Sequence, residues 1–84
     1  MKTKDFGLAS LCVAKGLDLA GHEVDERGQV WFMFCDSTTT SDIEDRYYKN
    51  TIDVRVQDFI SAQKMLKTLI FETKRKLEAS SRGM

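Results

Sequence analysis

The chain contains few of the residues that bind metal ions. It has two cysteines, Cys12 and Cys35, one histidine, His22, and no CxxC pair. Zinc sites usually have four ligands at close spacing, so we expect no metal site. The cysteines have apolar neighbours, which favours two buried free thiols in a reducing cytoplasm over a disulfide. The same neighbours disfavour a nucleophilic cysteine, which needs a nearby base and an electropositive site.

The chain also lacks an excess of charge and a long apolar run. Thirteen basic and thirteen acidic residues cancel, so no overall field attracts nucleic acid or an anionic membrane. No apolar run has the length of a transmembrane helix, and we expect a cytoplasmic protein. The 84 residues contain no repeat or linker. We therefore expect one domain over 1–84, with an ordered core at about 4–78 and a frayed tail at 79–84.

No group of residues predicts catalysis. His22 lies beside Glu23, but adjacent strand residues point to opposite faces, so the two cannot readily act together. The hydroxyl-rich segment 37–41 is surrounded by acidic residues, which favours a helix-capping loop over a phosphate site. We expect a protein that is not an enzyme and binds no cofactor.

One segment of the chain is strongly apolar. The charged turn Asp25–Gly28 leads into Gln29–Cys35, whose six consecutive apolar residues predict a strand. Alternate strand residues share a face. One face carries Val30, Phe32 and Phe34, and the other carries Trp31, Met33 and Cys35. A chain of this size buries only roughly 60–65 % of its unfolded surface, so we expect a partner to cover one face.

The remaining segments predict three helices and two further strands. Asp5 is a suitable N-cap for a first helix, and Ser41 with Glu44 matches a capping box before a second. The expected elements are a helix at 6–15, strands at 17–24 and 29–35, a helix at 42–49, a strand at 52–56 and a helix at 57–79. This order, α-β-β-α-β-α, predicts an α+β domain with helices on one face of a two- or three-stranded antiparallel sheet and a long C-terminal helix.

Several segments carry a resemblance when they are taken in order. They are TKDFGLASL at 3–11 leading to Lys15-Gly16, VWFMF at 30–34, YYKN at 47–50, Ile52-x-Val54, and LKTLIF at 66–71. Together they resemble a small domain family of unknown function found in bacteria and their phages. One departure is Arg55, where such members tend to carry Asp before the last helix. The resemblance implies a compact stand-alone domain, often phage-encoded, with no assigned activity.

The excess of apolar surface favours a binding function. We hypothesise a non-enzymatic binding or accessory protein of phage origin that docks to a protein partner, for example as an inhibitor of a bacterial defence system. We also expect a homodimer built on the apolar strand, the long helix or both. The candidate interaction surface is Trp31, Met33, Cys35, Leu66 and Leu69.

An alternative is a small nucleic-acid-binding module. Aromatic side chains beside cations suit base stacking and phosphate contact. The candidate patch is Arg46, Tyr48, Lys49, Arg55, Lys64 and Lys67. The absence of a basic excess makes this the second choice, with a solvated charged face as the simpler interpretation.

Overall fold

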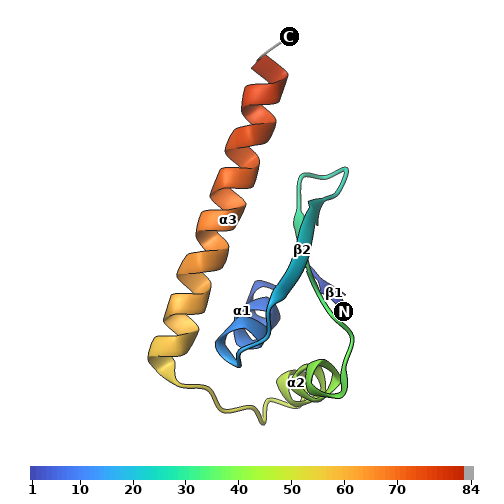
Figure 1. The fold of residues 1–84 in the computed structure, drawn as a ribbon, viewed down its shortest axis with the longest axis vertical. Helices are drawn as coiled ribbons and strands as arrows, with labels where there is room; N and C mark the ends of the chain where they lie inside the picture. Colours follow the sequence, from blue (N-terminus) through green and yellow to red (C-terminus); the bar gives the residue numbers. More distant parts are fainter. Residues whose placement is uncertain (83–84) are drawn as a thin grey trace.

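The structure is a computed structural model, which describes residues 1–82 and the side chains of residues 1–78. It confirms an α+β domain with a three-stranded antiparallel sheet and a long C-terminal helix (Figure 1). The elements are β1 (Lys2–Thr3), α1 (Phe6–Ala14), β2 (Leu19–Val24), β3 (Val30–Phe34), α2 (Thr38–Tyr48) and α3 (Val56–Arg82). Among the described residues, none of the helices combines the length and apolarity needed to cross a membrane.

The sheet has the order β1-β3-β2, so the apolar strand β3 lies at its centre. The β2–β3 hairpin pairs Val24 with Val30 and has a bulge between Leu19 and Gly21. Gly28 closes the hairpin turn with a φ of 81°, a conformation that favours glycine. The hairpin and its turn agree with the sequence prediction.

The third strand differs from the expected one. Residues 52–56 were expected to pair, but β1 at the N-terminus takes the free edge of β3, with Thr3 opposite Phe32. Residues 51–55 form an extended connection whose Ile52 and Val54 side chains pack against the core. Their alternation therefore reflects one-sided packing and not strand pairing. A strand of two residues, such as β1, is too short to produce a periodic pattern.

Two helix boundaries also differ from the expected ones. Helix α2 begins at Thr38, because Ser37 is its N-cap and accepts a hydrogen bond from the Thr40 amide at 3.1 Å. The Thr40 hydroxyl is buried and donates to the Cys35 carbonyl at 2.8 Å, which favours this earlier start over the capping box at Ser41. Helix α3 continues to Arg82, past the expected end at 79. The last two residues of the expected frayed tail, 83–84, lie outside the described residues.

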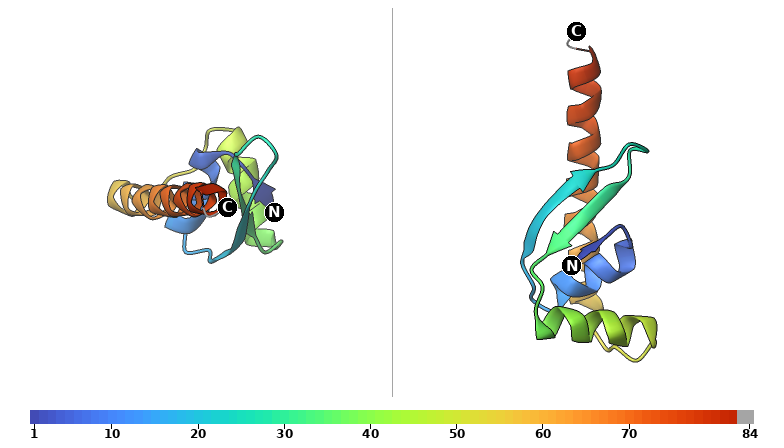
Figure 2. Two further views of the ribbon diagram at one scale, coloured as in Figure 1. Left: turned by 90° about the horizontal axis from the view of Figure 1, so that it is seen from above. Right: turned by 90° about the vertical axis from the view of Figure 1, so that its right-hand side faces the viewer.

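The core lies between the sheet and the helices. The inner face of β3 is buried, as expected, and packs against α1 and α3. Residues 8–12 of α1 are all buried, because this helix lies between the sheet, α2 and α3 (Figure 2). The largest completely buried side chains are Phe32, Leu8 and Leu66, one from each layer. Helix α3 runs beyond this core and past the β2–β3 hairpin (Figure 2).

Asp5 joins the first two helices. As expected, it is the N-cap of α1, accepting from the Leu8 amide at 3.1 Å. The Tyr47 hydroxyl of α2 donates to both carboxylate oxygens of Asp5, at 3.0 and 3.1 Å. Burial, and then this hydrogen bond, raises the pKa of Tyr47. The space beside the pair is closed, since a Cβ atom on Gly7 would lie 2.8 Å from the Tyr47 hydroxyl oxygen.

We therefore predict that Gly7→Ala destabilises the protein through Tyr47. In isolation, alanine stabilises a helix by about 1 kcal/mol relative to glycine, but here its methyl group displaces the Tyr47 hydroxyl from Asp5. In a Tyr47→Phe background the same substitution should become neutral or stabilising. Urea unfolding of the wild type, the two single variants and the double variant measures this coupling. Equal effects of Gly7→Ala in both backgrounds would contradict the close contact.

Candidate interaction surfaces

The outer face of the sheet is covered by the chain's own charged side chains. Trp31 is half-buried, and its indole nitrogen donates to Asp25 Oδ2 at 2.9 Å. The ammonium groups of Lys2 and Lys4 lie 5.3 and 5.6 Å from the centre of its ring. Lys2 also forms an ion pair with Glu23 of β2, the strand at the other edge of the sheet. These cation–π contacts and the hydrogen bond to Asp25 partly cover Trp31 within its own chain.

The five residues of the expected interaction surface do not lie together. Trp31 and Met33 are on the outer face of the sheet, and Cys35 is exposed just after β3, contrary to the buried position expected for it. Leu66 is 0 % exposed and belongs to the core, so it offers no surface in the folded chain. Leu69 is half-buried and lines a groove on the opposite side of the sheet.

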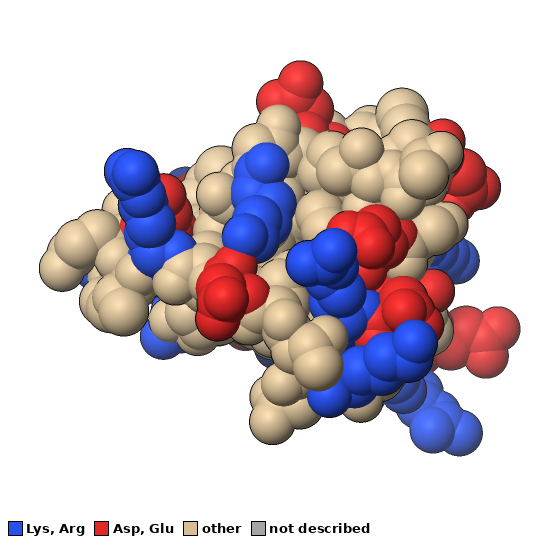
Figure 3. Space-filling model, turned by 90° about the horizontal axis from the view of Figure 1, so that it is seen from below, with Lys and Arg blue, Asp and Glu red and all other residues tan. Residues whose placement is uncertain are grey.

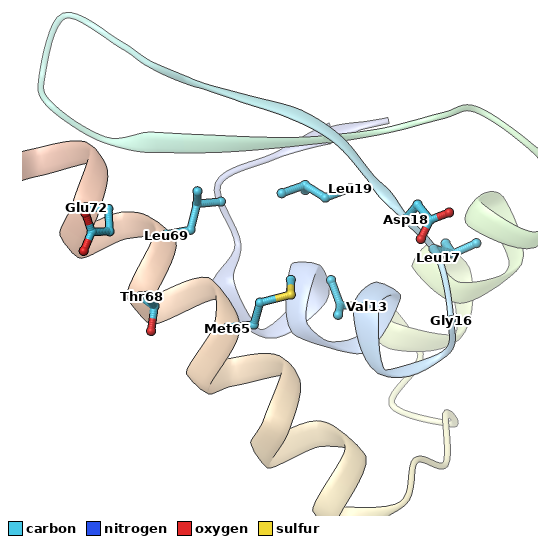
Figure 4. Close-up of a pocket in the computed structure, with 9 residues that line it drawn as sticks. All are labelled: Val13, Gly16, Leu17, Asp18, Leu19, Met65, Thr68, Leu69 and Glu72. Atoms are coloured by element: carbon cyan, nitrogen blue, oxygen red, sulfur yellow. The ribbon is translucent and has the colours of Figure 1, made fainter. Parts of the chain in front are cut away.

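That groove has a volume of about 550 Å³ and lies between α1, the start of β2 and the middle of α3. Figure 4 shows side chains from all three elements arranged around it. Its apolar lining is formed by Val13, Leu17, Leu19, Met65 and Leu69. The charged residues at its margin are both acidic, Asp18 and Glu72. The sequence did not reveal this groove, because its walls come from three separated segments.

A helix-ending turn shapes one wall of the groove. Gly16 has a φ of 92°, and its amide donates to the Val13 carbonyl at 3.0 Å. The Leu17 amide donates to the Cys12 carbonyl at 3.0 Å, which completes a Schellman motif. The turn follows Ala14, the last residue of α1, and leads into the start of β2. Figure 4 shows Leu19 of β2 and Met65 of α3 along the groove, with Leu17 at its far end beside Asp18.

The groove continues along α3. A smaller hollow of about 230 Å³ shares Leu69 and Glu72 with it and extends to His22 and Leu77. The His22 ring lies 3.3 Å from the Thr73 hydroxyl. Strand β2 is at the edge of the sheet, so its outer backbone groups adjoin this side of the molecule. Together these features form an elongated surface bounded by a strand edge and a helix.

Helix α3 also exposes large apolar side chains. Met65, Phe71 and Leu77 are 46, 65 and 47 % exposed. Leu77 lines the smaller hollow together with His22 of β2. Phe71 and Met65 were not among the predicted site residues, because helical periodicity alone does not show which flank of a helix is covered.

The expected nucleic-acid patch is divided between two helices. On α2, Arg46 forms an ion pair with Asp42 at 3.1 Å, and Lys49 with Asp45 at 3.0 Å. Tyr48 is 68 % exposed beside them, while Lys64 and Lys67 are exposed on α3. Arg55 is exposed at the end of the connection. Figure 3, which views this end of the molecule, shows basic and acidic side chains interspersed. Within the described part of the chain, no three His, Cys, Asp or Glu residues are grouped so as to hold a metal ion.

The hydrogen bond between Trp31 and Asp25 predicts an acid transition. It lowers the pKa of Asp25 below its usual 3.8, and the Gln29 and Arg27 amides add to this effect. Because the folded-state pKa is depressed, the stabilisation is present above about 3.8 and is lost as the pH falls through the lower folded-state value. Fluorescence of Trp31, the only tryptophan, should therefore change with a midpoint below 3.8. An Asp25→Asn variant that shows the same transition would contradict this assignment.

The two thiols should differ sharply in reactivity. Burial, followed by the charge of Glu44, raises the pKa of Cys12 to about 11, whereas Cys35 is exposed. Since the thiolate is the reactive form, an aromatic disulfide reagent at about pH 8 should modify Cys35 alone in the native protein. Intact-mass spectrometry should show one adduct in buffer and two in strong denaturant. Equal rates for both thiols in buffer would contradict the burial of Cys12.

The comparisons with known proteins agree with the resemblance noted in the sequence. A family model described as "Domain of unknown function (DUF5659)" matches residues 1–72. This range includes β1, α1, the hairpin, α2 and α3 as far as Glu72. No curated protein and no solved structure shows significant similarity to the chain. Since the model covers most of the 84 residues, the chain belongs to the DUF5659 family, a family of domains of unknown function.

Proposed function

We propose that the protein is a non-enzymatic binding protein that docks to a protein partner through the groove along α3. The observation that carries this proposal is the apolar lining of the 550 Å³ groove beside the unpaired edge of β2. An apolar groove that is open to water marks an interaction surface more often than a structural feature. Four of its lining residues are partly buried and pack against the core, so much of the groove is present without a partner.

The shape and chemistry of the groove suit a polypeptide. The two connected hollows follow α3 from Met65 to Leu77, which matches an elongated segment better than a compact small molecule. An extended segment can pair with the free edge of β2 while its apolar side chains enter the groove. Asp18 at the margin favours a partner with a lysine or arginine beside its apolar residues, whereas Glu72 is partly neutralised by Arg75 at 2.6 Å.

The cellular setting of this proposal is a bacterial cytoplasm during phage infection. The support for it is the small size of the chain and the bacterial and phage occurrence implied by the family resemblance. In this setting the protein acts as an accessory protein, for example by covering a surface of a host defence protein. Two free thiols agree with a reducing compartment.

The nucleic-acid-binding alternative is less favoured. The basic residues of α2 are partly neutralised by acids one helical turn away, which weakens their attraction for phosphate. Lys64 and Lys67 lie on a different helix from Tyr48. If this alternative holds, fluorescence anisotropy should detect binding to oligonucleotides that falls steeply as salt rises. Oligonucleotide binding without peptide binding would overturn the protein-docking proposal.

We predict that the groove selects peptides from a displayed library of random dodecamers. Selected sequences should contain apolar residues flanked by lysine or arginine. Met65→Glu should weaken their binding by about tenfold or more, since it places an unpaired charge against the apolar lining. Fluorescence anisotropy with labelled synthetic peptides measures the change.

A matched control is available on the same helix. Val56→Glu also replaces an exposed apolar residue of α3 with glutamate, but Val56 does not line the groove. It should leave the affinity unchanged. Failure to enrich any peptide, or equal losses for both variants, would contradict the proposed site.

A further inference from the structure

The side of α3 that borders the groove carries two exposed apolar residues placed symmetrically about Thr68, and Met65 and Thr68 also line the groove. Met65 lies three residues before Thr68 and Phe71 lies three residues after it, and both are substantially exposed. The Thr68 hydroxyl donates to the Lys64 carbonyl at 3.0 Å. Its polar group is therefore satisfied within its own helix, so the side chain can approach another helix closely.

The charges on the same flank have the same symmetry with opposite sign. Lys64 lies four residues before Thr68, and Glu72 lies four residues after it. Glu72 also forms an exposed ion pair with Arg75 at 2.6 Å, and exposed pairs of this kind are weak enough to be exchanged for a contact with another copy. Residues three and four apart share one side of a helix, so all five positions form a continuous strip. When two such strips run antiparallel about Thr68, Met65 comes level with Phe71 of the other copy, and Lys64 comes level with Glu72. At one level an apolar residue then lies beside an apolar residue, and at the other a basic residue lies beside an acidic residue.

We propose that a second copy of this chain docks on α3, with the two α3 helices antiparallel and Thr68 at the two-fold axis. This inference rests on the proposed function, since it names the partner that covers the α3 wall of the groove. The strip consists of Lys64, Met65, Thr68, Phe71 and Glu72. Such an isologous contact closes after two copies, so it gives a dimer and not a chain of molecules.

The observations favour this face and this direction over the alternatives. The outer face of the sheet already has Trp31 covered by Lys2 and Lys4. A parallel arrangement of α3 would place Lys64 beside Lys64 and Glu72 beside Glu72, which is repulsive at both levels. The antiparallel arrangement also sets opposite ends of the two helix dipoles side by side. The strip contains no core residue, so the fold does not depend on the contact.

A charge-reversal experiment tests the register. In sedimentation equilibrium at tens of micromolar, the wild type should have about twice the 9.6 kDa chain mass. Lys64→Glu and Glu72→Lys should each raise the dimer dissociation constant by about tenfold or more, because each change makes two symmetry-related pairs repulsive. The double variant should return to within about threefold of the wild type. Lys74→Glu, a similar reversal on the same helix outside the strip, should have little effect.

Cysteine pairing tests the direction independently. In a Cys35→Ser background, an equimolar mixture of Lys64→Cys and Glu72→Cys proteins should form a mixed disulfide under mild oxidation. Neither protein alone should cross-link efficiently. Cross-linking of Lys64→Cys with itself would instead indicate a parallel pair and overturn the proposed register, as would charge reversals that fail to compensate each other.

The outcomes separate this inference from the function on which it rests. A mass near 9.6 kDa at tens of micromolar, together with peptide binding sensitive to Met65→Glu, overturns the dimer and leaves the groove as a site for another protein. A monomer that binds no peptide overturns both. Far-ultraviolet circular dichroism of each variant identifies any that fail to fold. In that case Lys64→Gln and Glu72→Gln, which remove charge without reversing it, should each weaken the dimer more mildly, and unchanged association would overturn the charge pairing.

Discussion

The packing of α1 between the sheet, α2 and α3 is the contact on which the rest of the structure depends. Five consecutive residues of this helix, 8–12, are buried, which occurs when a helix is covered around most of its circumference. The sheet, α2 and α3 each pack against α1, so it sets their relative positions. The small size of this central helix also limits the core. Helix α3 has 27 residues against nine in α1, and its side chains at 74–78 are all exposed.

The groove follows from this mismatch in length. Helix α1 ends at Ala14, and the turn at Gly16 leads the chain into β2 and leaves a space between β2 and α3. The space is lined by apolar residues because it is continuous with the core. Because α1 is short, some apolar surface of the groove stays exposed, and a binding partner can cover this surface.

The sequence predicted the features that depend on local chemistry. Six consecutive apolar residues identified β3, Asp5 identified the start of α1, and the Asp25–Gly28 segment identified the hairpin turn. It did not predict β1, whose two residues pair because of tertiary contact and not because of their own propensity. It placed the start of α2 at the capping box of Ser41, whereas Ser37 is the cap. The hydrogen bond from the buried Thr40 hydroxyl to the Cys35 carbonyl favours the earlier start, and it becomes visible only in three dimensions.

The candidate sites were less predictable than the fold, for a related reason. The apolar residues on both faces of β3 correctly indicated a strand, but Trp31 is covered by Lys2, Lys4 and Asp25 from other segments. Conversely, the helical pattern around Phe71 does not show that this residue is exposed, because its exposure depends on where the neighbouring elements end.

The groove and the helix strip also share Met65, Thr68 and Glu72, so one wall of α3 belongs to both surfaces. Two ligands that need the same wall cannot bind it together, and each lowers the apparent affinity of the other. The balance between a second copy and another protein would then depend on the concentration of the chain.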